Sequence, residues 1–277
     1  MGIALAMMVL AMLGANAGAQ TAKNIPLPFS PGETLTYNVN WSIFPAGKLT
    51  ATLARDKKDS GDAFVVTTTA SSQGFVSLLY NVQDEFRSVF DPKTLCSLQI
   101  SKQTNEGRRH KITKITFDSH RGLAILDEHD PGGGNTAPKH AEHEIPPCVE
   151  DIITAFYFVR SQPLHVGQTI KLAVNDGSKT TTVIAAVTAR RKIKTPLGIH
   201  EALRVEPSVF GNLYEQKKGR LVIWFSDDEH HYPLRIKATL MLGAITGTLA
   251  SVSPTPSGYS GTPAGETETK PGESVLK

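Results

Sequence analysis

Apolar side chains alternate with polar ones in short runs along most of this sequence, and no other feature constrains the fold as strongly. Leu35, Tyr37 and Val39 alternate with polar residues near the beginning, and Leu234 and Ile236 do so near the other end. A period of two residues is typical of a β-strand with one buried and one solvated face. Similar runs lie at 48–55, 64–71, 83–90, 95–103, 111–118, 123–129, 179–191, 202–207, 221–226 and 244–251. The sequence therefore predicts about a dozen strands.

Short polar turns separate these runs. Residues 59–62 (Asp-Ser-Gly-Asp), 105–107 (Asn-Glu-Gly) and 217–219 (Lys-Lys-Gly) are connections of the kind that join antiparallel neighbours. They leave no room for helical crossovers, which excludes a parallel α/β sheet. Because a sheet this large must limit its exposed edges, we predict a mainly β fold: a single large antiparallel sheet that is strongly curved or closed into a barrel.

One segment has a helical period instead. Between residues 149 and 160, apolar side chains recur at spacings of three and four: Val149, Ile152, Ile153, Phe156 and Val159. Acidic residues at 150 and 151 and a basic residue at 160 suit the two ends of the helix dipole. Prolines at 146, 147 and 163 mark its limits. We predict one helix in the chain, at about 149–160.

The two ends of the chain differ from the strand-rich domain, residues 20–253. Residues 1–19 hold an uncharged apolar run followed by small residues, which is typical of a signal peptide cleaved after Ala19; a buried N-terminal helix is the alternative. Residues 254–277 are rich in Pro, Gly, Ser and Thr, which is typical of a disordered tail or of a linker that docks a partner. No other apolar run approaches the roughly 20 residues of a transmembrane helix. We expect a periplasmic or secreted protein with no transmembrane segment in the mature chain.

A short internal similarity lies within the strand-rich domain. Residues 32–40 (GETLTYNVN) and 167–175 (GQTIKLAVN) share Gly, Thr, Val and Asn at matching positions, 135 residues apart. Two similar β-meanders with the helix between them would produce this pattern. A two-fold internal duplication and a chance match over nine positions are both open.

Cys96 and Cys148 are the only cysteines in the sequence. An even number of cysteines in an oxidising compartment favours a disulfide. This one would close a loop of about fifty residues, tie a strand to the start of the helix and contribute on the order of 4 kcal/mol. Two buried free thiols are the alternative. We predict the disulfide.

Charge and motifs exclude several functions. The sequence has 29 Lys and Arg residues against 26 Asp and Glu, a net charge of +3, and no dense basic stripe, so nucleic acid is not an expected partner. It contains no Gly-x-Ser-x-Gly elbow, P-loop, dinucleotide fingerprint or His-Glu-x-x-His pair. We therefore assign no catalytic residue, no metal site and no cofactor.

Two polar clusters have residue types that bind cations. His140 and His143 are spaced as on one face of a helix, but prolines at 138, 146 and 147 predict a polar surface loop there instead. Residues 227–231 (Asp-Asp-Glu-His-His) combine carboxylates with imidazoles, which suits cation binding or acid–base chemistry. For this second cluster we favour a solvated turn at a strand end.

Many large apolar side chains accompany the predicted strands. A curved sheet of this size has more concave surface than one short helix covers, which predicts an apolar groove for a lipid or acyl ligand; a packed core that uses the same side chains is the alternative. The expected lining residues are Tyr37, Trp41, Phe44, Phe75, Leu79, Tyr80 and Trp224. We therefore favour a binding or carrier protein over an enzyme. A structural or assembly factor with an envelope protein as its partner, and an unrecognised hydrolase, are the alternatives.

Several longer motifs match a known pattern. They are 28–37 (PFSPGETLTY), 46–47 (AG), 151–160 (DIITAFYFVR), 195–198 (TPLG), 223–228 (IWFSDD) and Pro233. From about residue 29 to 249 the chain resembles an exported bacterial family known as domain of unknown function 3108. The resemblance implies an envelope protein and carries over no catalytic residue. In architecture alone, the predicted sheet is also similar to the open half-barrels of periplasmic lipoprotein carriers, which hold acyl chains.

Overall fold

Fourteen strands and two helices make up the described part of the chain. The computed structural model describes residues 26–58, 61–107, 109–131, 137–208, 219–241, 243–256 and 259. The strands are β1 (Thr34–Trp41), β2 (Phe44–Lys58), β3 (Gly61–Ser72), β4 (Gln83–Phe90), β5 (Ser97–Glu106), β6 (Arg109–Asp118), β7 (Leu123–His129), β8 (Lys139–Glu144), β9 (Thr169–Asn175), β10 (Thr180–Thr195), β11 (Gly198–Pro207), β12 (Arg220–Ser226), β13 (Pro233–Leu240) and β14 (Gly243–Ser253). The helices are α1 (Gly74–Leu79) and α2 (Thr154–Ser161). The prediction of a mainly β chain is confirmed.

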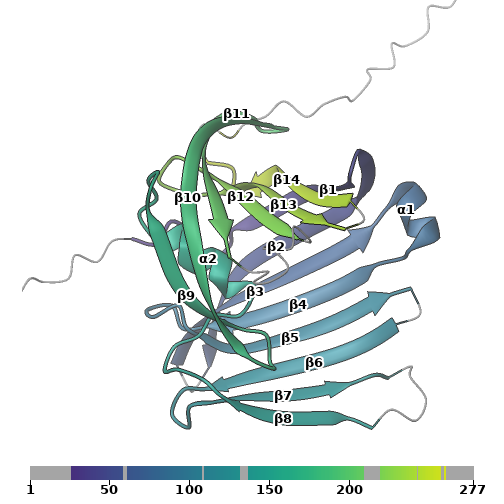
Figure 1. The fold of residues 1–277 in the computed structure, drawn as a ribbon, viewed down its shortest axis with the longest axis vertical. Helices are drawn as coiled ribbons and strands as arrows, with labels where there is room; N and C mark the ends of the chain where they lie inside the picture. The colour runs from purple at the N-terminus through teal and green to yellow at the C-terminus, as the bar shows by residue number, and fades with distance from the viewer. Residues whose placement is uncertain are drawn as a thin grey trace, which may run out of the picture.

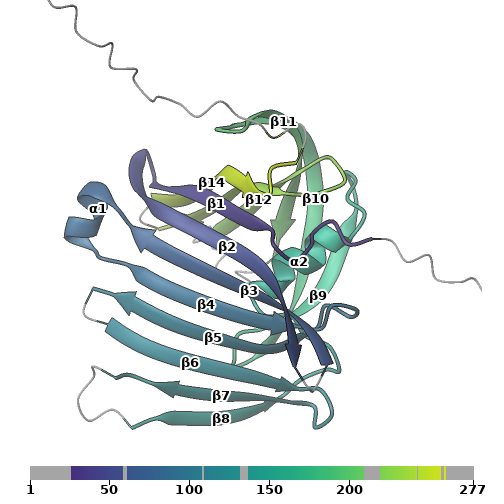
Figure 2. The same ribbon diagram turned by 180° about the vertical axis from the view of Figure 1, so that it is seen from behind.

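All these strands belong to one antiparallel sheet, in the order β8-β7-β6-β5-β4-β3-β2-β1-β14-β13-β12-β11-β10-β9. The chain runs through β1 to β8 as one meander and through β9 to β14 as a second, and the pairing of β1 with β14 joins the two. The sheet curls strongly, so that α2 lies within its curve (Figures 1 and 2). This arrangement confirms the predicted single, strongly curved sheet.

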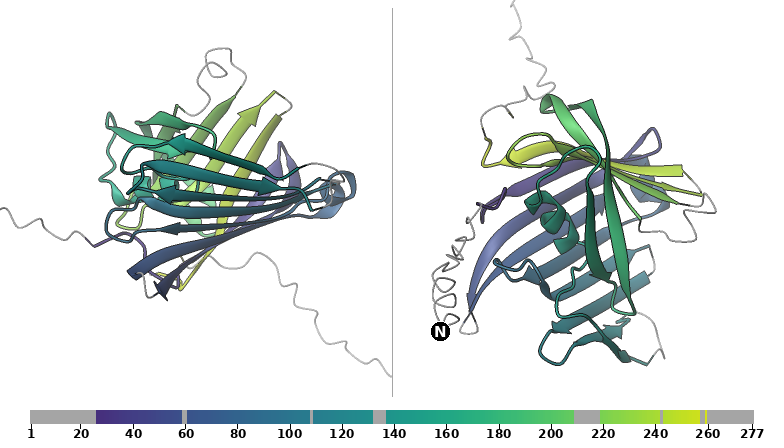
Figure 3. Two further views of the ribbon diagram at one scale, coloured as in Figure 1. Left: turned by 90° about the horizontal axis from the view of Figure 1, so that it is seen from below. Right: turned by 60° about the vertical axis from the view of Figure 1, so that its left-hand side comes forward.

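The turn between β9 and β10 packs against the first meander. Gly177 in this turn has a φ of +94°, and a Cβ atom there would lie 2.7 Å from the side chain of Ile115 on β6 and 3.1 Å from that of Leu126 on β7. A side chain would therefore be both strained and too close to its neighbours. The right-hand view of Figure 3 shows β9 and β10 crossing in front of the first meander. The hairpin thus narrows the open side of the curled sheet.

The helices differ from the prediction of a single helix at 149–160. α2 begins later, at Thr154, because the backbone of the residues before it is bound to strands. The Val149 carbonyl accepts a hydrogen bond from the N–H of Ser97 at 2.8 Å, and Glu150 forms a parallel bridge with Val174. Asp151 then accepts hydrogen bonds from backbone N–H groups of the first turn, in the manner of a helix cap. α1, which the sequence analysis did not predict, has only six residues, too few for a helical period to be recognised.

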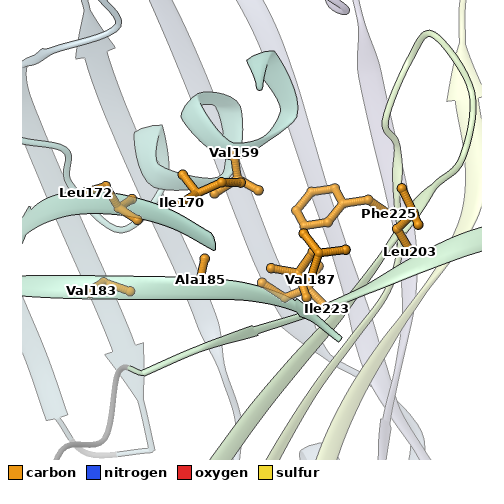
Figure 4. Close-up of a cluster of buried hydrophobic side chains, with 10 residues drawn as sticks. Val159, Ile170, Leu172, Val183, Ala185, Val187, Leu203, Ile223 and Phe225 are labelled. Carbon is orange, nitrogen blue, oxygen red and sulfur yellow. The ribbon is translucent and has the colours of Figure 1, made fainter. Parts of the chain in front are cut away.

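The core follows the concave face of the sheet. One cluster packs α2 against the second meander, with Val159 of the helix over Leu172 of β9, Val187 of β10 and Phe225 of β12 (Figure 4). Three further clusters continue along the two meanders. The alternation in the sequence thus reports directly which face of each strand is buried.

Cys96 and Cys148 form the predicted disulfide, and their Cα atoms lie 5.2 Å apart. The bond ties the residue just before β5 to the segment that leads into α2. Its partners are 52 residues apart in sequence, so in the chain-entropy model it contributes about 4 kcal/mol to stability.

The two similar segments begin their strands in the same way. Gly32, with a φ of +99°, donates its N–H to the carbonyl of Leu53 at 2.7 Å, and Gly167, with a φ of +93°, donates to Val187 at 2.8 Å. Each segment therefore starts the first strand of a long hairpin, one at the head of each meander. The duplication itself stays a prediction.

Residues 1–19, predicted as a signal peptide, lie outside the described residues. Of the predicted tail, residues 254–256 and 259 are described, and Tyr259 is buried and stacks on His200 with ring centroids 4.6 Å apart. Within the described ranges, neither helix has the length and apolar character needed to cross a membrane.

Candidate functional site

A cleft of about 270 Å³ lies between α2 and the concave face of β9 to β12. Every residue that lines it is apolar: Ile152, Phe156 and Val159 come from the helical segment, and Leu172 and Ile223 are among the strand residues. Ile152 is 41% exposed, so the cleft meets solvent beside this side chain. In Figure 4 the side chain of Val159 extends from α2 toward the strands that carry Ala185 and Phe225, two other residues of the lining. The lining of the cleft therefore favours apolar groups over polar ones.

The shortness of α2 explains why the sheet is not fully covered. The helix has eight residues, a length of roughly 12 Å. β10 alone has sixteen residues and extends for roughly 53 Å. Ala155 on the helix and Ala185 on β10 both line the cleft, and these small side chains leave room where larger ones would fill it. Apolar strand surface consequently extends beyond the helix.

A buried ion pair fixes α2 against the first meander. Arg160 Nη1 and Nη2 donate to the two carboxylate oxygens of Glu33 at 2.6 and 2.9 Å, and Arg160 is 1% exposed. The guanidinium also lies 5.2 to 5.4 Å from the ring centroids of Phe29, Tyr157 and Tyr232. Burial alone would lower the pKa of Arg160, but the hydrogen bonds and charge of Glu33 raise it above its ordinary value. Arg160 therefore stays charged, and its contacts with Glu33 hold the C-terminal end of the helix.

A second polar cluster holds the beginning of α2. The carboxylate of Asp151 accepts hydrogen bonds from the hydroxyls of Ser88 at 2.6 Å, Ser97 at 2.9 Å and Thr154 at 3.1 Å, and all four residues are buried. Ser88 lies on β4 and Ser97 on β5, so the cluster attaches the helical segment to the first meander. Together with the Arg160 ion pair, it positions the helix wall of the cleft.

None of the predicted ligand-lining residues with a described side chain lines this cleft. Tyr37 is buried, and Trp224 packs against the cluster that contains Tyr37. The side chain of Leu79 lies outside the described part of the structure. The cleft is lined mainly by aliphatic residues of the helical segment and of strands β9 to β12.

The other four predicted residues are exposed at one end of the sheet. Trp41, Phe44, Phe75 and Tyr80 have exposed fractions of 43%, 56%, 68% and 47%. The segment before α1 is bound to the β1–β2 hairpin, because the N–H of Gln73 donates to the carbonyl of Ala46 at 2.8 Å. Trp41 itself lies opposite Phe44 on β2 and Ile245 on β14. Exposed apolar side chains on neighbouring elements extend this surface. We call the set the apolar rim: Trp41, Ile43, Phe44, Phe75, Leu78, Tyr80, Leu240, Met241 and Ile245.

The histidines near residue 140 lie on a strand, not in the surface loop that the prolines predicted. β8 contains both His140 and His143, and residues three apart on a strand point to opposite faces. His140 Nδ1 is 2.7 Å from a carboxylate oxygen of Asp127, whose hydrogen bond and charge raise the pKa of the imidazole. These contacts link the edge strand β8 to β7.

The carboxylates and histidines at 227–231 form the turn between β12 and β13. Asp228 accepts hydrogen bonds from the hydroxyl of Ser226 at 2.8 Å, from the N–H of His230 at 2.9 Å and from the hydroxyl of Tyr259. Burial would raise the pKa of Asp228, but the bonds from Tyr259 and Ser226 hold it below its ordinary value. Among the residues that the structure describes, no three His, Cys, Asp or Glu side chains are grouped as a metal site would require.

Comparison with known proteins gives a fold but no activity. A β-barrel-like protein of the domain of unknown function DUF1849, from Brucella abortus, is similar with a TM-score of 0.52 and 6% identity, over 79% of this chain and 96% of that chain. A Bacteroides fragilis protein with a YmcC-like fold gives a TM-score of 0.36 and 11% identity, over 82% of this chain and 97% of that chain. No curated protein matches the sequence. At such low identity the Brucella protein shows a shared fold only.

The match to a family is more direct. The model of the proteins of unknown function DUF3108 matches residues 36–250, from the start of β1 almost to the end of β14. It therefore spans both meanders and the helix between them. This chain belongs to the DUF3108 family of proteins of unknown function.

Proposed function

We propose that this protein binds an apolar, lipid-like ligand in the cleft beside α2 and acts as a carrier rather than as an enzyme. The observation that carries the proposal is the lining of the cleft, which consists only of apolar residues around about 270 Å³. An apolar cavity of about 150 Å³ stays dry and is large enough for benzene. A cleft of this size therefore suits a short alkyl chain or a part of a longer one.

The energetics favour such a ligand. Each buried methylene group contributes about 0.8 kcal/mol, so a segment of about eight carbons gains roughly 6 kcal/mol before the costs of ordering are subtracted. A polar ligand would gain nothing comparable, because the lining offers it no hydrogen-bond partner. The walls are also held in place by the Arg160 and Asp151 clusters, which reduces the cost of organising the site.

We also propose that the protein is exported, with residues 1–19 as a cleaved signal peptide and residues 254–277 as a tail. The disulfide between Cys96 and Cys148 supports an oxidising compartment such as the periplasm.

The apolar rim supports a second candidate, an assembly factor that contacts a protein partner in the cell envelope. Contiguous exposed apolar surface is typical of interaction sites. The sequence analysis expected the ligand to contact Trp41, Phe44, Phe75 and Tyr80. This contact stays a prediction, separate from the assembly-factor role.

A dye-displacement titration tests the cleft. Decanol should displace an apolar fluorescent dye from the protein, and Ala155→Phe, which places a ring in the cleft, should weaken both dye and decanol binding at least tenfold. Ala54→Phe, on an exposed position of β2, is the matched control and should leave both unchanged. Equal binding by the two variants would show that the ligand does not bind in the cleft.

A further inference from the structure

A second cavity, of about 740 Å³, lies on the first meander beside the turn between β9 and β10. It is polar, in contrast to the cleft beside α2. Along each of three neighbouring strands, the face that is apolar near α2 becomes charged toward this cavity: Lys102 follows Ile100 on β5, Lys111 precedes Ile115 on β6, and Glu128 follows Leu126 on β7. Residues two or four apart on a strand share a face, so these charges continue the concave surface.

Three carboxylates of this cavity already have hydrogen-bond donors. Glu128 is 2.7 Å from the Nζ of Lys111 and accepts a hydrogen bond from the hydroxyl of Thr113 at 3.3 Å. Glu106 accepts a hydrogen bond from the hydroxyl of Tyr80 at 3.1 Å. Asp176 accepts from the N–H and the hydroxyl of Ser178 within its own turn, at 2.8 and 2.7 Å.

Three cationic side chains of the same cavity lack such partners among the described residues. Lys102, Arg109 and Lys139 line it, and their side chains form no hydrogen bond or ion pair with any residue in the described ranges. Lys102 is partly buried, and loss of hydration lowers its pKa, although the more distant charges of Asp151 and Asp176 oppose this effect. A partly buried ammonium group without a close counterion is costly, and a bound anion would remove that cost.

We propose that this cavity binds an oxyanion, the phosphate or carboxylate group of a ligand, through Lys102, Arg109 and Lys139. A guanidinium and two ammonium groups suit such a group, since arginine can contact two of its oxygens at once and lysine acts as a point charge. The site goes beyond the apolar cleft and does not depend on it. The oxyanion is either free in solution or the headgroup of an amphipathic molecule, and the experiment separates these two sources.

Isothermal titration of the full chain with inorganic phosphate and with decyl phosphate tests the proposal. We expect Lys102→Gln to weaken binding of the phosphate group at least tenfold and Lys102→Arg to restore most of it. Lys237→Gln, at an exposed position of β13, is the matched control and should have no effect. If Lys102→Gln fails to fold, the double variant R109Q/K139Q, at exposed positions of the same cavity, replaces it.

The outcomes separate the two sources. Tighter binding of decyl phosphate than of inorganic phosphate identifies a headgroup site, and equal affinities identify a site for a free anion. The proposal is overturned if neither compound binds, or if binding of both is the same in Lys102→Gln and in the Lys237→Gln control. Decanol carries no charge and reports only the apolar cleft, so a failure of that cleft is recognised separately.

Discussion

Arg160 and Glu33 form a two-pronged ion pair in the interior, although 127 residues separate them in the sequence. Arg160 lies in the last turn of the helix that walls the cleft, and Glu33 directly precedes the first strand of the sheet. The pair thus connects the cleft to the first meander. It is therefore one of the two buried polar contacts that position the helix, beside the hydrogen bonds to Asp151.

Arg160→Met should lower the free energy of unfolding by about 3 to 5 kcal/mol, because it leaves the Glu33 carboxylate buried without its partner. Arg121→Met is the control, since Arg121 and Glu142 form an exposed ion pair at 3.4 Å and its loss should cost less than about 1 kcal/mol. Urea denaturation of both variants measures the difference. Similar losses in the two would show that the buried pair does not anchor the helix.

Reduction of the disulfide should destabilise the protein by about 4 kcal/mol in the chain-entropy model. The thermal midpoint of the wild type should therefore fall when a reductant is added. The double variant C96S/C148S should unfold at the lower midpoint with or without reductant. A wild-type midpoint that does not respond to reductant would contradict a structural bond between Cys96 and Cys148.

Glu150 should make stability depend on pH. Burial raises the pKa of its carboxyl group to about 7, above that of an exposed glutamate. A raised carboxyl pKa means that the folded state holds the proton more tightly than the unfolded state, so stability falls as the pH rises from about 4.5 to about 7. Glu150→Gln removes this loss. Its unfolding free energy relative to wild type should therefore increase between pH 5 and pH 8, and a constant difference would show that the carboxyl group is not perturbed.

The apolar rim should tolerate substitution. Phe75 is 68% exposed, so Phe75→Asp should change the unfolding free energy by no more than about 0.5 kcal/mol. Because Phe75 does not line the cleft, decanol binding should stay as in wild type, and Phe75→Leu serves as the apolar control. Loss of decanol binding in a folded Phe75→Asp protein would instead place the ligand at the rim, where the sequence analysis expected it.

The architecture could be predicted because local sequence patterns determine it. A strand that buries one face and exposes the other to solvent has a two-residue period of apolar side chains, which identifies the strand. Short polar turns between strands predict the antiparallel pairing. The disulfide followed from the even number of cysteines. α1 was missed because its six residues are too few for a helical period, and the late start of α2 depends on Ser97 and Val174, which are distant in sequence.

The site was harder to predict for a physical reason. The prediction chose large aromatic residues as ligand contacts. In the structure Tyr37 is buried in the core, and Trp41 lies at the end of a hairpin. The cleft exists because Ala155 and Ala185 are small and because α2 is short, and neither feature has a signature in one sequence. That Lys102 has no hydrogen-bond or ion-pair partner among the described residues likewise depends on which strands surround it.

Native mass spectrometry tests the central claim most directly. The protein, purified from periplasm without detergent, should carry an apolar ligand in a stoichiometric amount that organic extraction releases. Ile152→Asp, which puts a charge where the cleft meets solvent, should lower the occupancy at least tenfold, whereas Ile199→Asp, at an exposed position of β11 outside the cleft, should keep it. A ligand-free mass for the wild type, or equal occupancy in the two folded variants, would contradict the binding of an apolar ligand beside α2.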